Sequence, residues 1–175
     1  MTSILLLPAR ADDLSSPTEW LHLGIQDSPA GNFPSALGDI LGQVTKPVRA
    51  ARWGAFWATQ SIEGRVRAVG LCSYKKEPND LGEVEIAYFT FPHREGRGIA
   101  TAMVRELTHT ASPHVASVIA HTLPVENASC KVLRRCGYAW VGEVIDPEDG
   151  LVWRWQLPAT LSRLRRDARA GMAGE

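Results

Sequence analysis

A glycine-rich turn joins a predicted strand directly to a predicted helix, and its residue types are those that bind phosphate. Gly96 and Gly98 lie in this turn, and Arg94 and Arg97 lie beside them. Glycine lets a ligand approach the backbone closely, and the first amides of a helix have no partner inside the helix. The helix dipole and the two arginines would both attract a pyrophosphate. The alternative is a tight connection that binds nothing; the lysine of a P-loop is missing, and the spacing differs from that of a dinucleotide fold.

Periodic patterns predict the elements that would position this turn. Residues 83–91 alternate, with Glu83 and Glu85 on one face of a strand and Val84 and Ile86 on the other. The other predicted strands are 3–8, 53–60, 66–74, 115–121, 138–145 and 151–157, and the predicted helices are 19–25, 36–44, 99–110 and 128–135. This order predicts a single mixed α/β domain over residues 1–157. A basic amphipathic helix and tail are expected over residues 158–175.

Charge and composition narrow the class of protein. Lys plus Arg and Asp plus Glu each number 19, so the formal net charge is zero, which argues against a dedicated nucleic-acid binder. The apolar run from Ile4 to Leu7 is too short to span a membrane and has no basic leader, so neither a membrane segment nor a secretory signal is expected. The three cysteines and the scattered histidines show no ligand-type spacing. We therefore expect reduced thiols, no metal site and a cytoplasmic location.

The turn resembles the coenzyme A pyrophosphate loop of the GNAT superfamily of N-acetyltransferases. That loop reads Gln/Arg-x-x-Gly-x-Gly/Ala; Gly98 and Ala100 match its last two fixed places, and Glu95 replaces the Gln or Arg. The resemblance extends over about residues 52–157. It implies a GNAT fold, in which a mixed central sheet has helices on both faces and a short C-terminal helix follows.

A second block resembles one branch of this superfamily. Residues 124–138 are similar to the Asn-x-x-Ser, Val-Leu and Gly-Phe signature of ribosomal-protein acetyltransferases. Ser129 takes the place of the signature's Ser, whereas Asn127 lies one place after the slot for Asn, which holds Glu126. Either the turn is locally shifted, or Asn127 contacts the coenzyme from a new angle.

The resemblance implies that acetyl-CoA donates an acetyl group to an amine by direct attack in a ternary complex. In the superfamily, coenzyme A lies between two splayed strands, and the backbone of the fourth strand faces the thioester. The implied cofactor-binding residues are Phe89, Thr90, Phe91, Arg94, Glu95, Gly96, Arg97, Gly98, Ile99, Ala100, Asn127 and Ser129.

The reaction needs a proton acceptor for the amine and a proton donor for the departing thiolate. Glu83 and Glu85 are the best candidates for the base, because they share a face of the strand that enters the turn, although both could be solvated surface carboxylates. Glu143, in the last hairpin, is the second choice. Leu133 occupies the place where many family members carry a Tyr that acts as the general acid. Ser129 is therefore the candidate acid, and its alternative role is that of a helix N-cap.

Two other functions stay open at this point. The fold could hold acyl-CoA as a regulatory module without turnover, or it could transfer a longer acyl chain. The acceptor could be a small molecule or a protein N-terminus, and a homodimer is also left open.

Overall fold

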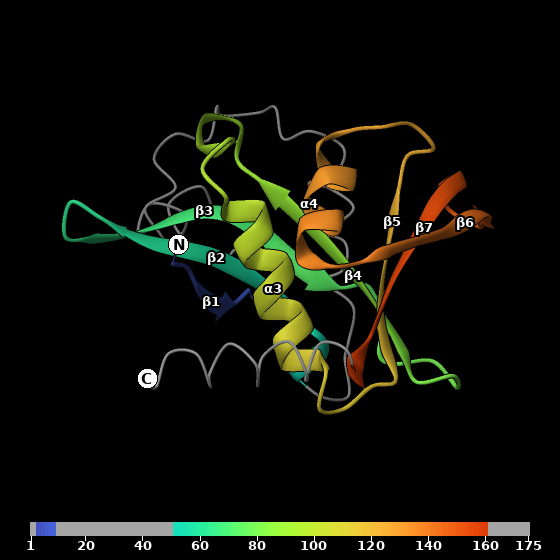
Figure 1. Cartoon of the computed structure of the whole chain (residues 1–175). Coiled ribbons are helices and arrows are strands. Elements are labelled where there is room, and N and C mark those ends of the chain that lie inside the picture. Colours follow the sequence, from blue (N-terminus) through green and yellow to red (C-terminus); the bar gives the residue numbers. More distant parts are fainter. Residues whose placement is uncertain (1–2, 10–50, 161–175) are drawn as a thin grey trace, which may run out of the picture. The chain divides into compact units, whose positions relative to one another are not determined.

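The computed structural model describes residues 3–9 and 51–160 of the 175-residue chain. The helices predicted over residues 19–25 and 36–44, and the tail after residue 160, lie outside the described residues. The described strands are β1 (Leu5–Pro8), β2 (Ala55–Ile62), β3 (Arg65–Tyr74), β4 (Glu83–Thr90), β5 (Ser117–Thr122), β6 (Ala139–Asp146) and β7 (Gly150–Pro158). The described helices are α3 (Ile99–Ala111), α4 (Ala128–Cys136) and the short 3-10 turns η2 (Ala51–Trp53) and η3 (Pro92–Arg94). This order confirms the predicted sequence of strands and helices in these ranges (Figure 1).

The seven described strands form one mixed sheet with the order β1-β2-β3-β4-β5-β7-β6. Strands β4 and β5 pair in parallel, and α3 is the crossover between them, as a parallel connection requires. The pairs β1–β2, β2–β3, β5–β7 and β6–β7 are antiparallel. The predicted mixed α/β fold is confirmed. None of the helices in the described ranges combines the length and the hydrophobicity that a membrane crossing needs.

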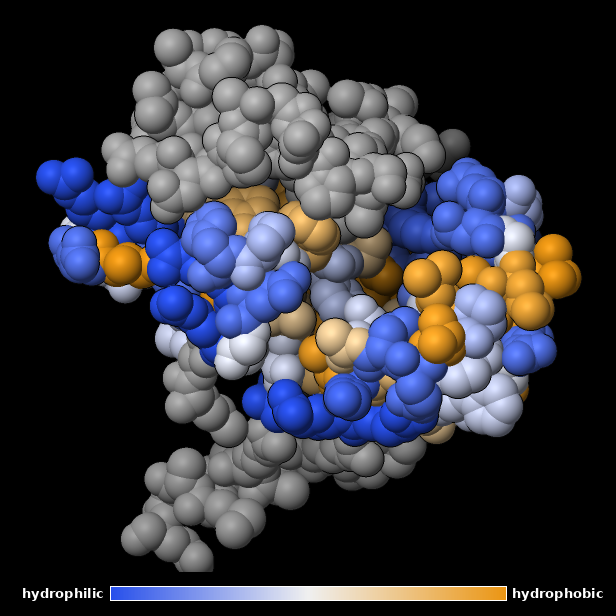
Figure 2. All heavy atoms as spheres, turned by 90° about the horizontal axis from the view of Figure 1, so that it is seen from above, coloured by the Kyte–Doolittle hydropathy of each residue, from blue (hydrophilic) through white to orange (hydrophobic). Residues whose placement is uncertain are grey.

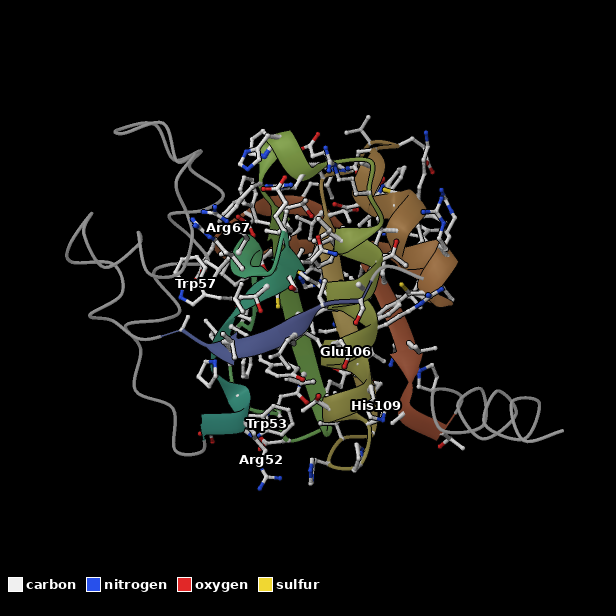
Figure 3. All side chains as sticks on the ribbon, turned by 90° about the vertical axis from the view of Figure 1, so that its left-hand side faces the viewer. Arg52, Trp53, Trp57, Arg67, Glu106 and His109 are labelled. Carbon is white, nitrogen blue, oxygen red and sulfur yellow. The ribbon has the colours of Figure 1, made fainter. Side chains whose placement is uncertain are left out.

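The described residues divide into two compact units. Unit 1 holds the described residues up to Glu77 together with Ala87–Met103. Its β2–β3 hairpin turns at Glu63 and Gly64, both of which have positive φ, as the tight hairpin turn requires. Trp53 and Trp57, labelled in Figure 3, are buried in this unit. The two tryptophans therefore belong to the core.

Unit 2 holds Pro78–Ile86 and the described residues from Val104 onward. Its sheet has an apolar face, which includes Val84 and Val118, and the helical residues Leu107 and Leu133 are buried in the same unit. The hydroxyls of Thr108 in α3 and Tyr138, just after α4, lie 2.7 Å apart in this core. The opposite face carries polar side chains, because Glu83 and Glu85 alternate with the buried positions of β4.

Candidate functional site

The turn between β4 and α3 has the local geometry of an anion site. After β4, the 3-10 turn η3 closes with hydrogen bonds from the Arg94 amide to the Phe91 carbonyl (2.8 Å) and from the Glu95 amide to the Pro92 carbonyl (3.3 Å). Gly96 and Gly98 then adopt φ values of +72° and +77°. Side chains rarely adopt this left-handed conformation, so the two glycines allow the chain to enter α3 directly.

Buried side chains fix the start of α3 in unit 1. Ile99 and Met103, one helical turn apart, are 1% and 0% exposed. A Cβ atom at Gly70 of β3 would lie 2.5 Å from the Phe89 carbonyl oxygen and 3.2 Å from the end of Met103. Only glycine at position 70 therefore allows β3 to approach both the Phe89 backbone and the helix so closely.

The turn can hold the diphosphate of a coenzyme. Residues 95–98 are exposed, a Cβ at Gly96 would meet nothing within 4 Å, and the first turn of α3 carries no acidic residue. Arg94 Nε and Thr90 Oγ1 are buried and have no hydrogen-bond partner in the described part of the chain. Unpaired buried polar groups are costly, so both are available for a ligand. These features fit acetyl-CoA, whose diphosphate would accept hydrogen bonds from the backbone amides that begin α3.

At the start of α4, three residues that the sequence analysis discussed have different structural roles. Asn127 is the N-cap, and its Oδ1 accepts from the Cys130 amide at 3.1 Å. Glu126, which occupies the signature's Asn slot, forms an exposed ion pair with Arg134. Ser129 is half-buried inside the helix. The N-cap alternative for Ser129 was therefore wrong, because the cap position belongs to Asn127.

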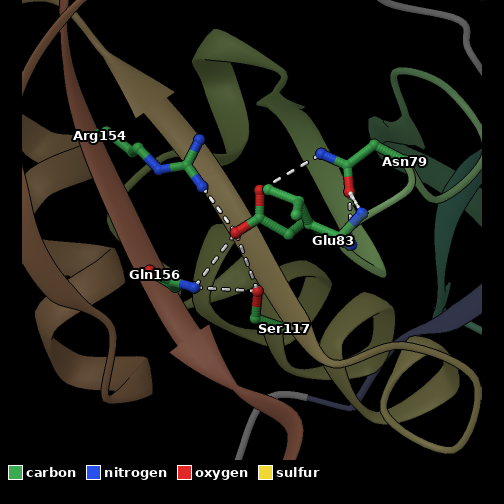
Figure 4. A network of polar contacts seen from close by, with 6 residues as sticks. Asn79, Glu83, Ser117, Arg154 and Gln156 are labelled. Carbon is green, nitrogen blue, oxygen red and sulfur yellow. Dashed lines mark hydrogen bonds and ion pairs between the residues drawn. The ribbon is translucent and has the colours of Figure 1, made fainter.

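Glu83 lies at the centre of a network on the polar face of unit 2 (Figure 4). Its Oε1 accepts from Arg154 Nη2 at 2.8 Å, Gln156 Nε2 at 3.3 Å and Ser117 Oγ at 3.4 Å, while its Oε2 accepts from Asn79 Nδ2 at 3.3 Å. Burial raises the pKa of the Glu83 carboxyl, but the hydrogen bonds and the charge of Arg154 outweigh it, so the net pKa is lowered. A carboxylate held in this way favours its ionised form and is a weak proton acceptor.

Glu85, two residues further along β4, has different neighbours. Its Oε1 lies 3.1 Å from His121 Nδ1 of β5, and the Asp146 Oδ2 at the end of β6 lies 3.8 Å from the same nitrogen. All three side chains are largely buried. Asp146 is held in place by its other oxygen, Oδ1, which accepts from the amides of Glu148 and Asp149 in the β6–β7 turn.

The sequence interpretation missed His121 because it compared the histidines only with one another. In the parallel register of β4 and β5, Glu85 lies opposite Ile119. His121 is two residues beyond Ile119, so it shares the face of Glu85. The signal was present in the alternation of the two strands, but their register is not visible in one sequence.

Glu143, the second choice for the base, lies apart from this group in β6. Its side chain is exposed and accepts from the indole nitrogen of Trp153 at 3.2 Å. The structure therefore gives Glu143 a cross-strand partner and no enclosed surroundings.

One group in the described residues has metal-ligating side chains close together. Ligand atoms of Glu85, His121 and Asp146 lie within 4.8 Å of one another. The sequence predicted no metal site, and it did not bring these three residues together.

The three cysteines are free, and Cys72 and Cys130 are buried. Burial raises the pKa of the Cys72 thiol, which keeps it protonated and unreactive.

Solved structures of acetyltransferases share this fold. A variant of the spermidine N-acetyltransferase SpeG from Vibrio cholerae superposes with a TM-score of 0.65 at 13% identity, covering 93% of this chain and 98% of the relative. The aminoglycoside acetyltransferase AAC(6')-Ib in complex with coenzyme A gives a TM-score of 0.64 at 18% identity, with 94% and 99% covered. A GNAT-family acetyltransferase from Bacillus anthracis gives a TM-score of 0.51 at 15% identity, with 61% and 66% covered.

Comparisons of the sequence with known proteins and with family models show which family the chain belongs to. A search among curated proteins finds no match. The model of the acetyltransferase (GNAT) domain matches residues 29–139, which is more than half of the chain and includes both the glycine turn and α4. With the strand–turn–helix geometry of residues 90–100, this match identifies the chain as a member of the GNAT acetyltransferase family and hence as an acyltransferase that depends on acetyl-CoA.

Proposed function

We propose that this protein is an N-acetyltransferase in which a primary amine attacks acetyl-CoA directly in a ternary complex. The turn of residues 95–98 carries the proposal, because it combines an exposed helix N-terminus with two left-handed glycines. The amides that begin α3, with Arg94 and Arg97, would hold the diphosphate. The backbone of residues 89–91 would face the thioester, and Gly70 supports this role because its missing Cβ lets β3 pack directly against the Phe89 carbonyl and hold that backbone in place.

The acceptor that fits the polar face of unit 2 is a cationic aliphatic amine. Glu85 and Asp146 present carboxylates on this face, and their side chains are 18% and 13% exposed. Acidic groups of this kind attract ammonium groups and hold them near a base. The relatives named for spermidine and aminoglycosides act on molecules with several amines. A protein N-terminus, the substrate type of the ribosomal-protein branch, is the other acceptor to be tested.

Proton transfer would accompany the attack. The acceptor ammonium must lose a proton so that its nitrogen can attack the carbonyl carbon, and the departing thiolate must gain one. We assign the role of proton acceptor to Glu85 and the side chains in contact with it. Glu83 is held by four hydrogen-bond donors, and Glu143 is exposed. Ser129 is the proposed donor to the thiolate. Asn127 would contact the coenzyme through its amide nitrogen, because its oxygen caps α4.

A thiol-release assay tests this function. Purified protein is given acetyl-CoA with spermidine, with an aminoglycoside or with a peptide that has a free N-terminus. We expect release of coenzyme A, and a mass gain of one acetyl group on the amine, to be fastest with spermidine or the aminoglycoside. Butyryl-CoA in place of acetyl-CoA measures the acyl preference. Tight binding of acetyl-CoA with no acetylated product from any acceptor would contradict the proposal.

A homodimer and a cytoplasmic location complete the proposal. Strand β6 is at the edge of the sheet and exposes Trp140, Val141 and Ile145. The space-filling view in Figure 2 shows hydrophobic atoms among hydrophilic ones on the displayed face. An exposed apolar edge strand favours pairing with a second copy. Three free cysteines are typical of a reducing compartment. Light scattering of the parent and of Ile145→Lys tests the dimer, which should dissociate in the variant.

A further inference from the structure

One histidine on the polar face of unit 2 has two ring nitrogens in opposite surroundings. The Nδ1 atom of His121 lies 3.1 Å from Glu85 Oε1 and 3.8 Å from Asp146 Oδ2. Its Nε2 atom is buried and has no hydrogen-bond partner in the described ranges. The side chain is 11% exposed, so water satisfies little of it.

These surroundings select one tautomer. Ionised carboxylates only accept hydrogen bonds, so the nitrogen between Glu85 and Asp146 must carry a proton. A second proton on Nε2 would create a buried donor without an acceptor, which is costly. The geometry therefore places a proton on Nδ1, and the neutral tautomer that fits it has its lone pair on Nε2. A lone pair of this kind is the group that a general base needs.

We propose that His121 Nε2 accepts the proton of the acceptor amine and that Glu85 and Asp146 are positioning residues that orient the ring. This proposal rests on the proposed function and changes the role of Glu85 from base to partner of the base. The ammonium gives one proton to Nε2, and its freed lone pair forms a bond to the acetyl carbon. The bond from that carbon to sulfur breaks. The Ser129 hydroxyl gives its proton to the thiolate and takes up the second proton lost by nitrogen. The products are the acetylated amine and coenzyme A, and His121 must release its proton before the next turnover.

Four charged groups on this face surround the ring's charge when it forms, namely Glu85, Asp146, Arg154 and Glu83. Glu85 of β4 and Asp146 of β6 both stabilise an imidazolium. Arg154 of β7 lies opposite His121 in the sheet register, but its guanidinium donates to Glu83. Glu83 thus neutralises the one cation placed across from the ring. The two carboxylates beside Nδ1 can stabilise the charge that His121 acquires on taking a proton.

The same three side chains could instead hold a divalent cation, and this is the competing explanation. A metal on Nδ1 would displace the proton from that nitrogen and would be bound by both carboxylates. It would leave Nε2 without a role, whereas the proton relay explains that atom. The experiments that follow distinguish the proton relay from a metal site.

The variant His121→Asn tests the relay. Asparagine can still donate to the carboxylates from near the Nδ1 position, but it lacks Nε2. With the best acceptor of the panel, we expect kcat to fall by about 10²- to 10⁴-fold, the typical contribution of a general base, and the acidic limb of the pH profile to disappear. Acetyl-CoA affinity measured by calorimetry should not change. His109→Asn is the matched control, because His109 is exposed on α3, and it should behave like the parent. In Asp146→Asn, kcat should fall less than in His121→Asn, because Glu85 still orients the ring.

Four results would overturn the proposal. The first is an active parent with His121→Asn within threefold of it. The second is a nitrogen NMR spectrum of the parent that shows the His121 proton on Nε2. The third is stoichiometric Zn²⁺ binding that His121→Asn abolishes, together with turnover that a chelator removes. If the parent acetylates no amine, the proposed function itself fails and the relay falls with it; that outcome differs from an active His121→Asn.

Discussion

The glycine turn of unit 1 and the polar face of unit 2 achieve their chemistry in opposite ways. The turn is one contiguous segment, residues 95–98, and it offers backbone amides whose direction is set by the φ values of two glycines. The polar face takes one or two side chains from each of β4, β5 and β7 and from the end of β6. The turn should therefore tolerate changes of side chain outside its glycines and Arg97, whereas the face depends on the identity of each side chain.

A second contrast lies within the polar face. Glu83 and Glu85 share one side of β4, yet Glu83 is hydrogen-bonded to Arg154, and Glu85 is hydrogen-bonded to His121. A permanent cation makes the first carboxylate a structural anchor. In the proposed mechanism, a titratable ring makes the second a partner in proton transfer. Variants at the two positions should therefore differ in kind: one should lose activity, and the other should lose stability.

Among the variants that test these two contrasts, the largest effect is expected for Glu85→Gln. Its amide keeps the size of the carboxylate but removes the charge that orients His121, while Asp146 still holds the ring. We expect kcat to fall by about 10- to 100-fold, with acetyl-CoA affinity and melting temperature unchanged. Steady-state kinetics at several pH values would check this. A loss greater than that of His121→Asn would return the role of base to Glu85 itself, for which the loss would be about 10²- to 10⁴-fold.

Gly98→Asp tests the turn. The new side chain lies on a residue with φ +77° and brings a negative charge to the expected diphosphate site. We expect acetyl-CoA affinity to fall by more than about tenfold, or 1.4 kcal/mol, as measured by calorimetry. Gly64→Asp is the matched control for backbone strain, since Gly64 has φ +74° with nothing within 4 Å. Equal losses of affinity in Gly98→Asn and Gly98→Asp would show that strain, not charge, causes the effect. Unchanged affinity in a folded Gly98→Asp would remove the diphosphate from this turn.

The two regions also differ in how far the sequence predicted them. The strand–turn–helix geometry of the turn could be predicted because it depends on neighbouring residues, and any helix start provides free amides. The strand alternation likewise placed Glu83 and Glu85 on one face. The partner of each carboxylate could not be predicted. His121 of β5 and Arg154 of β7 come close to β4 only because β5 pairs with both β4 and β7, and one sequence does not show these pairings. The cap of α4 was also missed, because Asn127 and Ser129 both have capping side chains and only the backbone decides between them.

The variant Glu83→Gln should lower stability more than activity. The folded pKa of Glu83 lies below its unfolded value, so its contribution to stability is fully present above the unfolded pKa of about 4.3 and is lost as the pH falls through the folded pKa. We expect the variant to lose about 1–2 kcal/mol in the free energy of unfolding at pH 7, as for a charged hydrogen bond that is partly exposed, and to approach the parent in acid. Urea denaturation at neutral and acidic pH measures this difference. The control is Glu106→Gln, at an exposed position of α3 (Figure 3), which should change stability little at either pH. A constant difference between parent and Glu83→Gln across this range would contradict the anchor role.

The smallest effect is expected for Ser129→Ala, and it shows whether Ser129 has a chemical role. As the proposed proton donor to the thiolate, Ser129 can be replaced by water, so kcat should fall only a few-fold. The helix start does not depend on this hydroxyl, because Asn127 accepts the Cys130 amide at 3.1 Å, and alanine is a strong helix former. The melting temperature of Ser129→Ala should therefore match that of the parent. Asn127→Ala should lose about 1 kcal/mol of stability through the missing cap. A Ser129→Ala protein that loses stability but keeps its kcat would assign the hydroxyl to the fold, and the thiolate would then take its proton from water or from the attacking amine.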